Sequence, residues 1–239
     1  MSIAAARLFL GPLLLAQGRH VRLTTPVLPE PVGARSGVEG VGNKPPLRLL
    51  VVGDSSAAGV GAERQEAALA QPLARALAKR RGGAVSWQLV AKSGVCAAEA
   101  VDLLHANRIA RADVLVTAVG MNDVTGQRAA RFLRDVEELW RVASRVAGVK
   151  HGVVSGLPPL HALPAAPQPL RWYLGRYARS LDRSLEDWVA RRRHLGFCSL
   201  QWAVEPGSIA SDGFHPGPRG YARWSMEAAD RVMEVLARG

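Results

Sequence analysis

The chain has 239 residues, of which 48% are hydrophobic and 21% are charged, a globular composition that excludes a disordered chain. Lys and Arg outnumber Asp and Glu by 31 to 20, which gives a formal net charge of +11. This charge is compatible with nucleic acid, anionic lipid or acidic polysaccharide. Because most of the basic residues are arginine in an Ala-rich and Leu-rich chain, the charge is weak support for any of these partners.

The first 22 residues form a separate apolar segment. Residues 3–16 are mostly apolar, and Arg19 and Arg22 follow them directly. The run is shorter than the roughly 20 apolar residues that span a membrane. Three interpretations stay open, in this order: an interfacial or anchoring helix, a helix packed on the domain, and a signal peptide. We expect a membrane-associated or exported protein in the first and last cases, with a cytoplasmic one as the alternative.

Residues 23–46 are rich in Pro, Gly and Val and keep neither the helical nor the strand period. We expect a linker or an extended strap here. The folded domain is predicted to begin at Leu47 and to occupy residues 47–239.

The domain begins with a short apolar run, residues 47–52, which predicts a buried strand of a parallel sheet. Strands and helices then alternate along the chain. We expect helices over 62–81 (interrupted by Pro72), 97–108, a long stretch after 123, 170–188 and the C-terminal end, and strands over 85–91, 113–120, 149–155 and 197–202. This pattern predicts an α/β fold with three layers (α/β/α) and a five-stranded, mostly parallel sheet of the doubly wound, flavodoxin-like kind.

The polar residues that suit catalysis follow the predicted strands. Ser55 comes after the first strand, Gly94 after the second and Asn122 after the third, while Asp212 and His215 lie in the loop after the fifth. The carboxyl ends of parallel strands share one edge, so these residues can meet in one cleft. A nucleophilic serine needs a base, a carboxylate that orients the base, and donors for the oxyanion.

Other roles are open to the same residues. Asn122 could cap the helix that follows it, His215 could be a turn residue, and Asp54 and Asp123 suit structural hydrogen bonds better than acid–base work. Cys96 and Cys198 have no spacing typical of a metal or redox site, and a disulfide between them is open. We predict no metal and no cofactor.

Four short blocks together are similar to those of the SGNH (GDSL-type) hydrolases. The blocks are GDSS at 53–56, Gly94, GMND at 120–123 and DGFHP at 212–216, and their order and spacing match that family over residue 47 to about residue 238. The resemblance implies hydrolysis of acyl or acetyl esters by a serine without metal. It implies that Ser55 is the nucleophile, His215 the base and Asp212 its orienting carboxylate, with Ser55, Gly94 and Asn122 as oxyanion donors. Ser56 departs from the pattern, because the family often has Leu there.

The leading hypothesis is therefore an esterase or lipase-like serine hydrolase. The alternatives are a catalytically silent binding protein on the same fold and a basic module that binds a membrane surface or an anionic ligand. As partners we expect a small-molecule, lipid or sugar ester substrate and no nucleic acid, with membrane association through residues 3–16 as a further option. Which ester is cleaved and the oligomeric state are not predicted.

Overall fold

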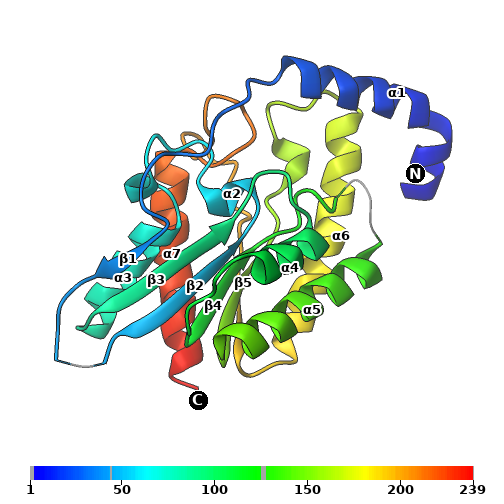
Figure 1. Cartoon of the computed structure of the whole chain (residues 1–239). Coiled ribbons are helices and arrows are strands. Elements are labelled where there is room, and N and C mark those ends of the chain that lie inside the picture. The colour runs from blue at the N-terminus through cyan, green and yellow to red at the C-terminus, as the bar shows by residue number, and fades with distance from the viewer. Residues whose placement is uncertain (1–2, 44, 125–127, 239) are drawn as a thin grey trace.

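The structure is a computed structural model that describes residues 3–43, 45–124 and 128–238. A six-stranded sheet with the order β1-β3-β2-β4-β5-β6 forms the middle of the domain (Figure 1). Every neighbouring pair is parallel except β1 with β3, which is antiparallel. The strands are β1 (Ser36–Glu39), β2 (Leu47–Gly53), β3 (Val85–Ala91), β4 (Val114–Ala118), β5 (His151–Ser155) and β6 (Leu195–Cys198).

Helices cover both faces of the sheet. They are α1 (Ile3–Thr24), α2 (Ser55–Ala58), α3 (Ala70–Arg81), α4 (Ala97–Ala106), α5 (Ala129–Ala147), α6 (Leu170–Ala190) and α7 (Pro218–Leu236), with two short 3-10 turns, η1 (Gln65–Ala67) and η2 (Leu160–Ala162). Helices α3 and α7 pack on one face, and α4, α5 and α6 pack on the other (Figure 1). The predicted three-layer α/β fold is therefore confirmed.

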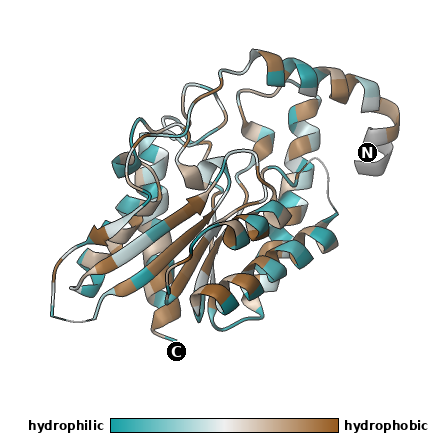
Figure 2. Cartoon of the chain, viewed as in Figure 1, coloured by the Kyte–Doolittle hydropathy of each residue, from teal (hydrophilic) through white to brown (hydrophobic). Residues whose placement is uncertain are grey.

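The apolar run of β2 explains why the sheet is buried on both faces. Successive side chains of a strand point to opposite faces. Leu49 and Val51 accordingly belong to the core under α3 and α7, whereas Leu50 and Val52 belong to the core under α4, α5 and α6. The central strands are hydrophobic along their length, and the helices turn their hydrophilic sides outward (Figure 2).

The predicted number of five strands is wrong, because β1 adds a sixth. Residues 36–39 lie in the segment that we expected to be a linker or strap, and they pair with β3 from Gln88 back to Val85. This short strand is mostly exposed and has the sequence SGVE, so no apolar alternation indicates it. The segment thus runs along the domain as a strap that joins the edge of its sheet.

Two further boundaries differ from the prediction. The helix expected over 62–81 begins only at Ala70, after the η1 turn, and Pro72 lies in its first turn, where a missing N–H breaks no helical bond. The strand expected over 197–202 spans Leu195–Cys198 instead. Leu200 and Trp202 are buried as loop residues, so their apolar character reflects packing rather than a strand.

Helix α1 rests on the N-terminal end of α6. Its Gln17 side chain donates a hydrogen bond to the Gln168 carbonyl (2.7 Å) and accepts one from the backbone N–H of Leu170 (3.0 Å), the first residue of α6. Gln17 therefore satisfies one of the free N–H groups at the start of α6. Within the described part of the chain, no helix is long and apolar enough to cross a membrane.

Candidate active site

Ser55 lies directly beyond the carboxyl end of the central strand β2. The strand ends at Gly53, and a Cβ atom there would lie 2.2 Å from the Ala118 carbonyl oxygen, so β2 and β4 approach this closely only because residue 53 is glycine. Asp54 caps the short helix α2, since its Oδ1 accepts a hydrogen bond from the Ser56 N–H at 2.9 Å. The turn thereby fixes Ser55 as the first residue of α2.

A loop from the other end of the chain brings His215 and Asp212 to Ser55. His215 Nε2 lies 2.8 Å from Ser55 Oγ, and His215 Nδ1 lies 2.6 Å from Asp212 Oδ2. An ionised carboxylate only accepts hydrogen bonds, so Nδ1 carries the proton towards Asp212 and Nε2 is left to accept from the serine hydroxyl. The three side chains form one continuous hydrogen-bonded chain.

Asp212 is buried but stays ionised. Burial alone would raise the pKa of this carboxyl group. Hydrogen bonds from the His215 ring and from the backbone N–H groups of Phe214 and His215 outweigh that effect and lower the pKa below its ordinary value. The same bonds fix the direction of the carboxylate, because one oxygen holds the two N–H groups and the other holds the ring. Asp212 thus presents a negative charge to the imidazole across the neutral pH range.

The register of the sheet places Gly94 and Asn122 on either side of this turn. Gly53 pairs with Ala91 of β3 and with Ala118 of β4, so the three strands end level with one another. Asn122 Nδ2 donates to the Val95 carbonyl at 2.9 Å, which joins the loop after β4 to the segment that carries Gly94.

The backbone N–H groups of Ser55 and Gly94 donate no hydrogen bond to any residue that the structure describes. Gly94 has a φ of +86°, a left-handed conformation that glycine adopts without strain. Asn122 Nδ2 has a second proton beyond the one given to Val95. Three donors of this neighbourhood are therefore available to a ligand.

Two buried carboxyl groups lie beside these residues. Burial raises the pKa of Asp54 to about 7 and that of Asp123 to about 6. Each group also accepts hydrogen bonds from backbone N–H groups, which lower its pKa but do not offset the effect of burial. Asp123 accepts from the N–H of Ala97 at 3.1 Å and so ties the loop after β4 to the start of α4. These contacts agree with the structural roles that we expected for both residues.

Glu30 is a residue of this region that sequence reasoning missed. Its Oε1 accepts hydrogen bonds from the N–H and the hydroxyl of Ser93, at 2.7 and 2.8 Å, immediately before Gly94. Its Oε2 pairs with Arg35 at 3.1 Å. The strap therefore anchors the turn that presents the Gly94 N–H. The one signal in the sequence is that Glu30 is the first carboxylate of the chain, after 29 residues without one.

A model of the GDSL-like lipase/acylhydrolase family matches residues 51–223, which includes every block noted above. The chain belongs to this family. It is therefore an ester-hydrolysing enzyme. No curated protein matches the sequence of this hydrolase.

Solved structures of lipases and esterases share the fold of this hydrolase. A lipase from a goat rumen metagenome is 18% identical, with a TM-score of 0.62 over 77% of this chain and 98% of its own. An esterase from Pseudoalteromonas sp., in a structure inhibited by monoethylphosphonate, is 16% identical, with a TM-score of 0.55 over 80% and 98%. A phospholipase A1 from Streptomyces albidoflavus NA297 is 16% identical, with a TM-score of 0.54 over 79% and 100%.

The structure brings Ser55, His215 and Asp212 of this hydrolase into contact and sets Gly94 and Asn122 on the adjoining loops. Cys96 and Cys198 are both free thiols. Among residues 3–43, 45–124 and 128–238, no three His, Cys, Asp or Glu side chains cluster closely enough to hold a metal ion.

Asp54 makes the stability of this hydrolase depend on pH. The folded protein keeps a proton on Asp54 up to about pH 7, whereas the unfolded chain releases it near its ordinary pKa of 3.8. The contribution of Asp54 to the free energy of unfolding therefore falls as pH rises between these values. Asp54→Asn keeps the acceptor for Ser56, so its stability relative to wild type should increase from about pH 4 to about pH 7 and then level off. Urea unfolding of both proteins across this range measures the difference, and a difference independent of pH would contradict the assignment.

Proposed function

We propose that this enzyme hydrolyses carboxylic esters with Ser55 as the nucleophile, His215 as the general base and Asp212 as the carboxylate that orients it. The observation that supports the proposal is the hydrogen-bonded chain from Ser55 Oγ through both nitrogens of His215 to Asp212, at 2.8 and 2.6 Å. These separations lie within the range that proton transfer requires.

In the proposed reaction, Oγ attacks the ester carbonyl carbon while His215 Nε2 takes the hydroxyl proton. The negative charge of Asp212 stabilises the imidazolium that forms. The tetrahedral intermediate collapses, His215 gives the proton to the departing alcohol, and an acyl group remains on Ser55. A water molecule, deprotonated by His215, then attacks the acyl-enzyme. The bond from the acyl carbon to Ser55 Oγ breaks, His215 returns the proton to Oγ, and the carboxylic acid is released.

We propose that the oxyanion is bound by the N–H groups of Ser55 and Gly94 and by the side-chain amide of Asn122. The support is that both N–H groups lack a partner among the described residues and that the three loops leave the sheet at one level. Donors fixed before the reaction stabilise developing charge without reorganisation. Glu30 contributes through Ser93, because it holds the Gly94 turn.

Replacement of the nucleophile or the base should abolish most turnover. We expect Ser55→Ala and His215→Ala each to lower kcat for p-nitrophenyl acetate and butyrate by at least about 1000-fold, since the hydroxyl is activated only by its base. Ser184→Ala serves as the matched control and should keep wild-type activity, because this half-buried serine of α6 donates its hydroxyl only to the Ser180 carbonyl of its own helix. Wild-type turnover by Ser55→Ala would refute the proposed mechanism.

Replacement of Asn122 should affect the transition state more than substrate binding. We expect Asn122→Ala to lower kcat by roughly 100- to 1000-fold with little change in KM. The variant also loses the bond to Val95, so thermal unfolding is measured in parallel. A small loss of kcat together with a large fall in melting temperature would indicate a purely structural Asn122.

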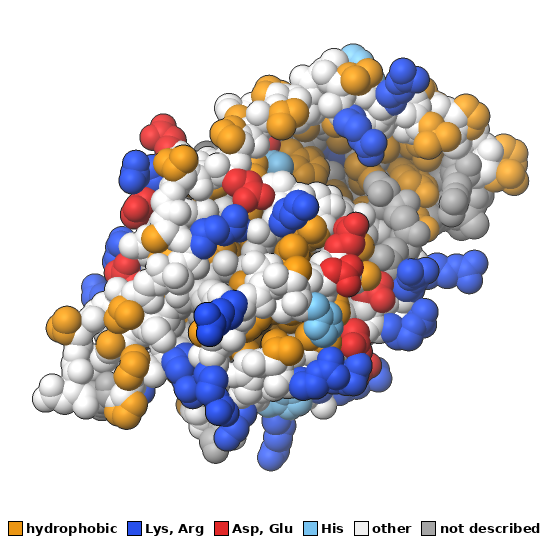
Figure 3. All heavy atoms as spheres, viewed as in Figure 1, with side chains coloured by type: hydrophobic (Ala, Val, Ile, Leu, Met, Phe, Trp, Pro, Cys, Tyr) orange, Lys and Arg blue, Asp and Glu red, His pale blue; other side chains and the backbone are white. Residues whose placement is uncertain are grey.

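We also propose that α1 associates with anionic lipid surfaces. The face of the helix that carries Leu14 and Gln17 rests on the domain, but Leu8, Phe9 and Leu15 are 77, 75 and 76% exposed. Hydrophobic side chains lie along α1 and in the hollow beneath it (Figure 3). Arg19 and Arg22 are exposed on the next turns. Apolar bulk followed by positive charge suits the boundary between acyl chains and anionic head groups.

Vesicle flotation tests this association. We expect the full chain to float with phosphatidylcholine vesicles that contain phosphatidylglycerol. The triple variant Leu8→Ser/Phe9→Ser/Leu15→Ser should stay in solution, because each Ser removes apolar surface that would otherwise insert into the lipid. Met226→Ser, at an exposed apolar residue of α7, is the control and should float as wild type does. Equal flotation of the triple variant, or none by wild type, would contradict the proposal.

A further inference from the structure

A small cavity lies beside the proposed catalytic residues. It has a volume of about 40 Å³, and its lining includes Ser56, Met121 and Phe214. These residues are the chain neighbours of Ser55, Asn122 and His215. The lining therefore contains a chain neighbour of the proposed nucleophile, of a proposed oxyanion donor and of the proposed base.

The walls of the cavity are mostly apolar, apart from Asp54 and Ser56, and come from both cores of the domain. Val119, Leu157 and Leu163 belong to the core under α4, α5 and α6, whereas Leu200, Trp202 and Trp224 belong to the core under α3 and α7. Apolar cavities bind apolar groups rather than water. A cavity that accepts benzene measures about 150 Å³. A space of about 40 Å³ therefore suits an acyl chain of only a few carbons.

The two tryptophans of the wall are held in different ways. Trp224 is fully buried in α7, and its indole N–H donates to Ser155 Oγ at 3.1 Å. Trp202 lies in the loop after β6, where no helix or strand fixes its backbone. The contacts that hold its ring come instead from side chains of α7. The position of this wall residue therefore depends on residues at the surface of the protein.

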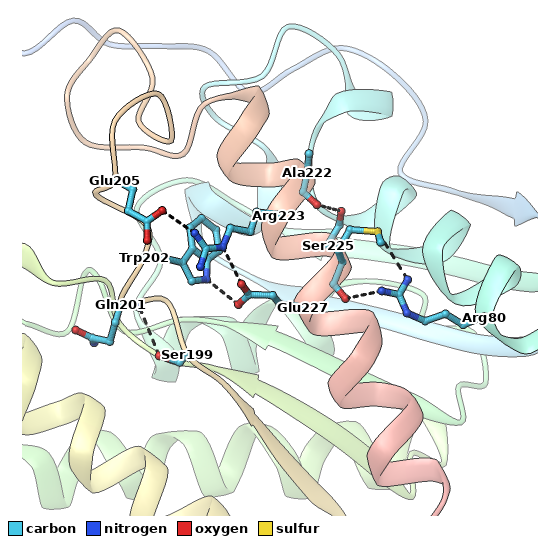
Figure 4. A network of polar contacts seen from close by, with 10 residues as sticks. Arg80, Ser199, Gln201, Trp202, Glu205, Ala222, Arg223, Ser225 and Glu227 are labelled. Carbon is cyan, nitrogen blue, oxygen red and sulfur yellow. Dashed lines mark hydrogen bonds and ion pairs between the residues drawn. The ribbon is translucent and has the colours of Figure 1, made fainter.

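Glu227 and Arg223 hold the Trp202 ring against α7 (Figure 4). The indole N–H donates to Glu227 Oε2 at 2.7 Å, and the Arg223 guanidinium carbon lies 4.7 Å from the ring centroid. Arg223 also donates to Glu227 Oε1 at 2.8 Å and to Glu205 Oε2 at 2.7 Å. Guanidinium–indole contact and a charge-assisted hydrogen bond both favour one ring position. Glu205 connects the same cluster to the loop that carries Trp202.

We propose that this cavity is the acyl pocket and that Trp202 limits it to short acyl groups, from acetyl to about butyryl. Glu227 and Arg223 are positioning residues that act through Trp202. The inference rests on the proposed function, because it assumes that the acyl group is carried by Ser55. The alcohol part of the ester lies outside the pocket, so the pocket selects the acyl group and leaves the class of alcohol open.

A chain-length series tests the pocket. The values of kcat/KM are measured for p-nitrophenyl acetate, butyrate and octanoate with wild type, Trp202→Ala and Trp202→Leu. We expect wild type to prefer acetate and butyrate, and each variant to raise the octanoate-to-acetate ratio by at least about tenfold, since each methylene accepted by an apolar pocket changes kcat/KM by roughly that factor. Thermal unfolding identifies any variant that does not fold, and Trp202→Leu keeps part of the apolar wall for that case. An unchanged ratio in a folded variant, or a wild type that prefers octanoate, overturns the inference.

Variants of Glu227 test whether this residue positions Trp202. Glu227→Ala removes the acceptor of the Trp202 indole and should shift the ratio in the same direction as Trp202→Ala, by less. Glu227→Gln keeps an oxygen that accepts from the indole and should restore the wild-type ratio. Glu234→Ala breaks an ion pair of the same kind on α7, with Arg231 at 2.7 Å, and should leave the ratio unchanged. A shift by all three variants, or by none, removes Glu227 from the account of specificity.

Ser55→Ala in the same series separates the two proposals. If Ser55→Ala is inactive and the ratio does not respond to Trp202, the pocket inference fails alone. If Ser55→Ala keeps wild-type turnover, the proposed function fails.

Discussion

The arrangement of this enzyme depends on the close parallel pairing of β2 with β3 and β4. Gly53 pairs with Ala91 and Ala118, and a Cβ atom at this position would collide with the Ala118 carbonyl oxygen at 2.2 Å. Because all three strands end at this level, their loops deliver Ser55, Gly94 and Asn122 to one edge of the sheet. The loop that follows β6 then needs only to reach across this edge for His215 to meet Ser55. The central strands that lead to this edge are buried between two layers of helices.

The sequence predicts the strands and residues that obey local rules. The apolar run of β2 and the alternation of β3 identify these strands, and the order of the four blocks identifies the five candidate site residues. Features that depend on distant partners escape prediction. Glu30 acts on Ser93 across 63 positions of the chain, and β1 gains its structure only from pairing with β3. The apolar character of Trp202 predicts a strand position, although the residue packs from a loop.

The outside and the inside of the domain contribute differently to the site. The strap and α1 lie on the outside: Glu30 holds the Gly94 turn, and Gln17 holds the start of α6. The apolar cavity lies inside, and its Trp202 wall is fixed by charged side chains of α7. The exposed apolar surface of α1 would bring the enzyme to a lipid surface, whereas the size of the cavity would decide which acyl group it removes. The proposed lipid affinity and the proposed preference for short acyl groups therefore concern separate parts of the molecule.

The central claim is that Ser55 is a nucleophile activated by His215. Covalent labelling with a fluorophosphonate, followed by peptide mass spectrometry, tests it directly, because the phosphorus reacts much faster with an activated nucleophile than with an ordinary serine hydroxyl. The account predicts one phosphonylated residue, Ser55, and loss of the label in His215→Ala. A label on the neighbouring Ser56, or labelling of Ser55 at an unchanged rate without His215, would contradict it.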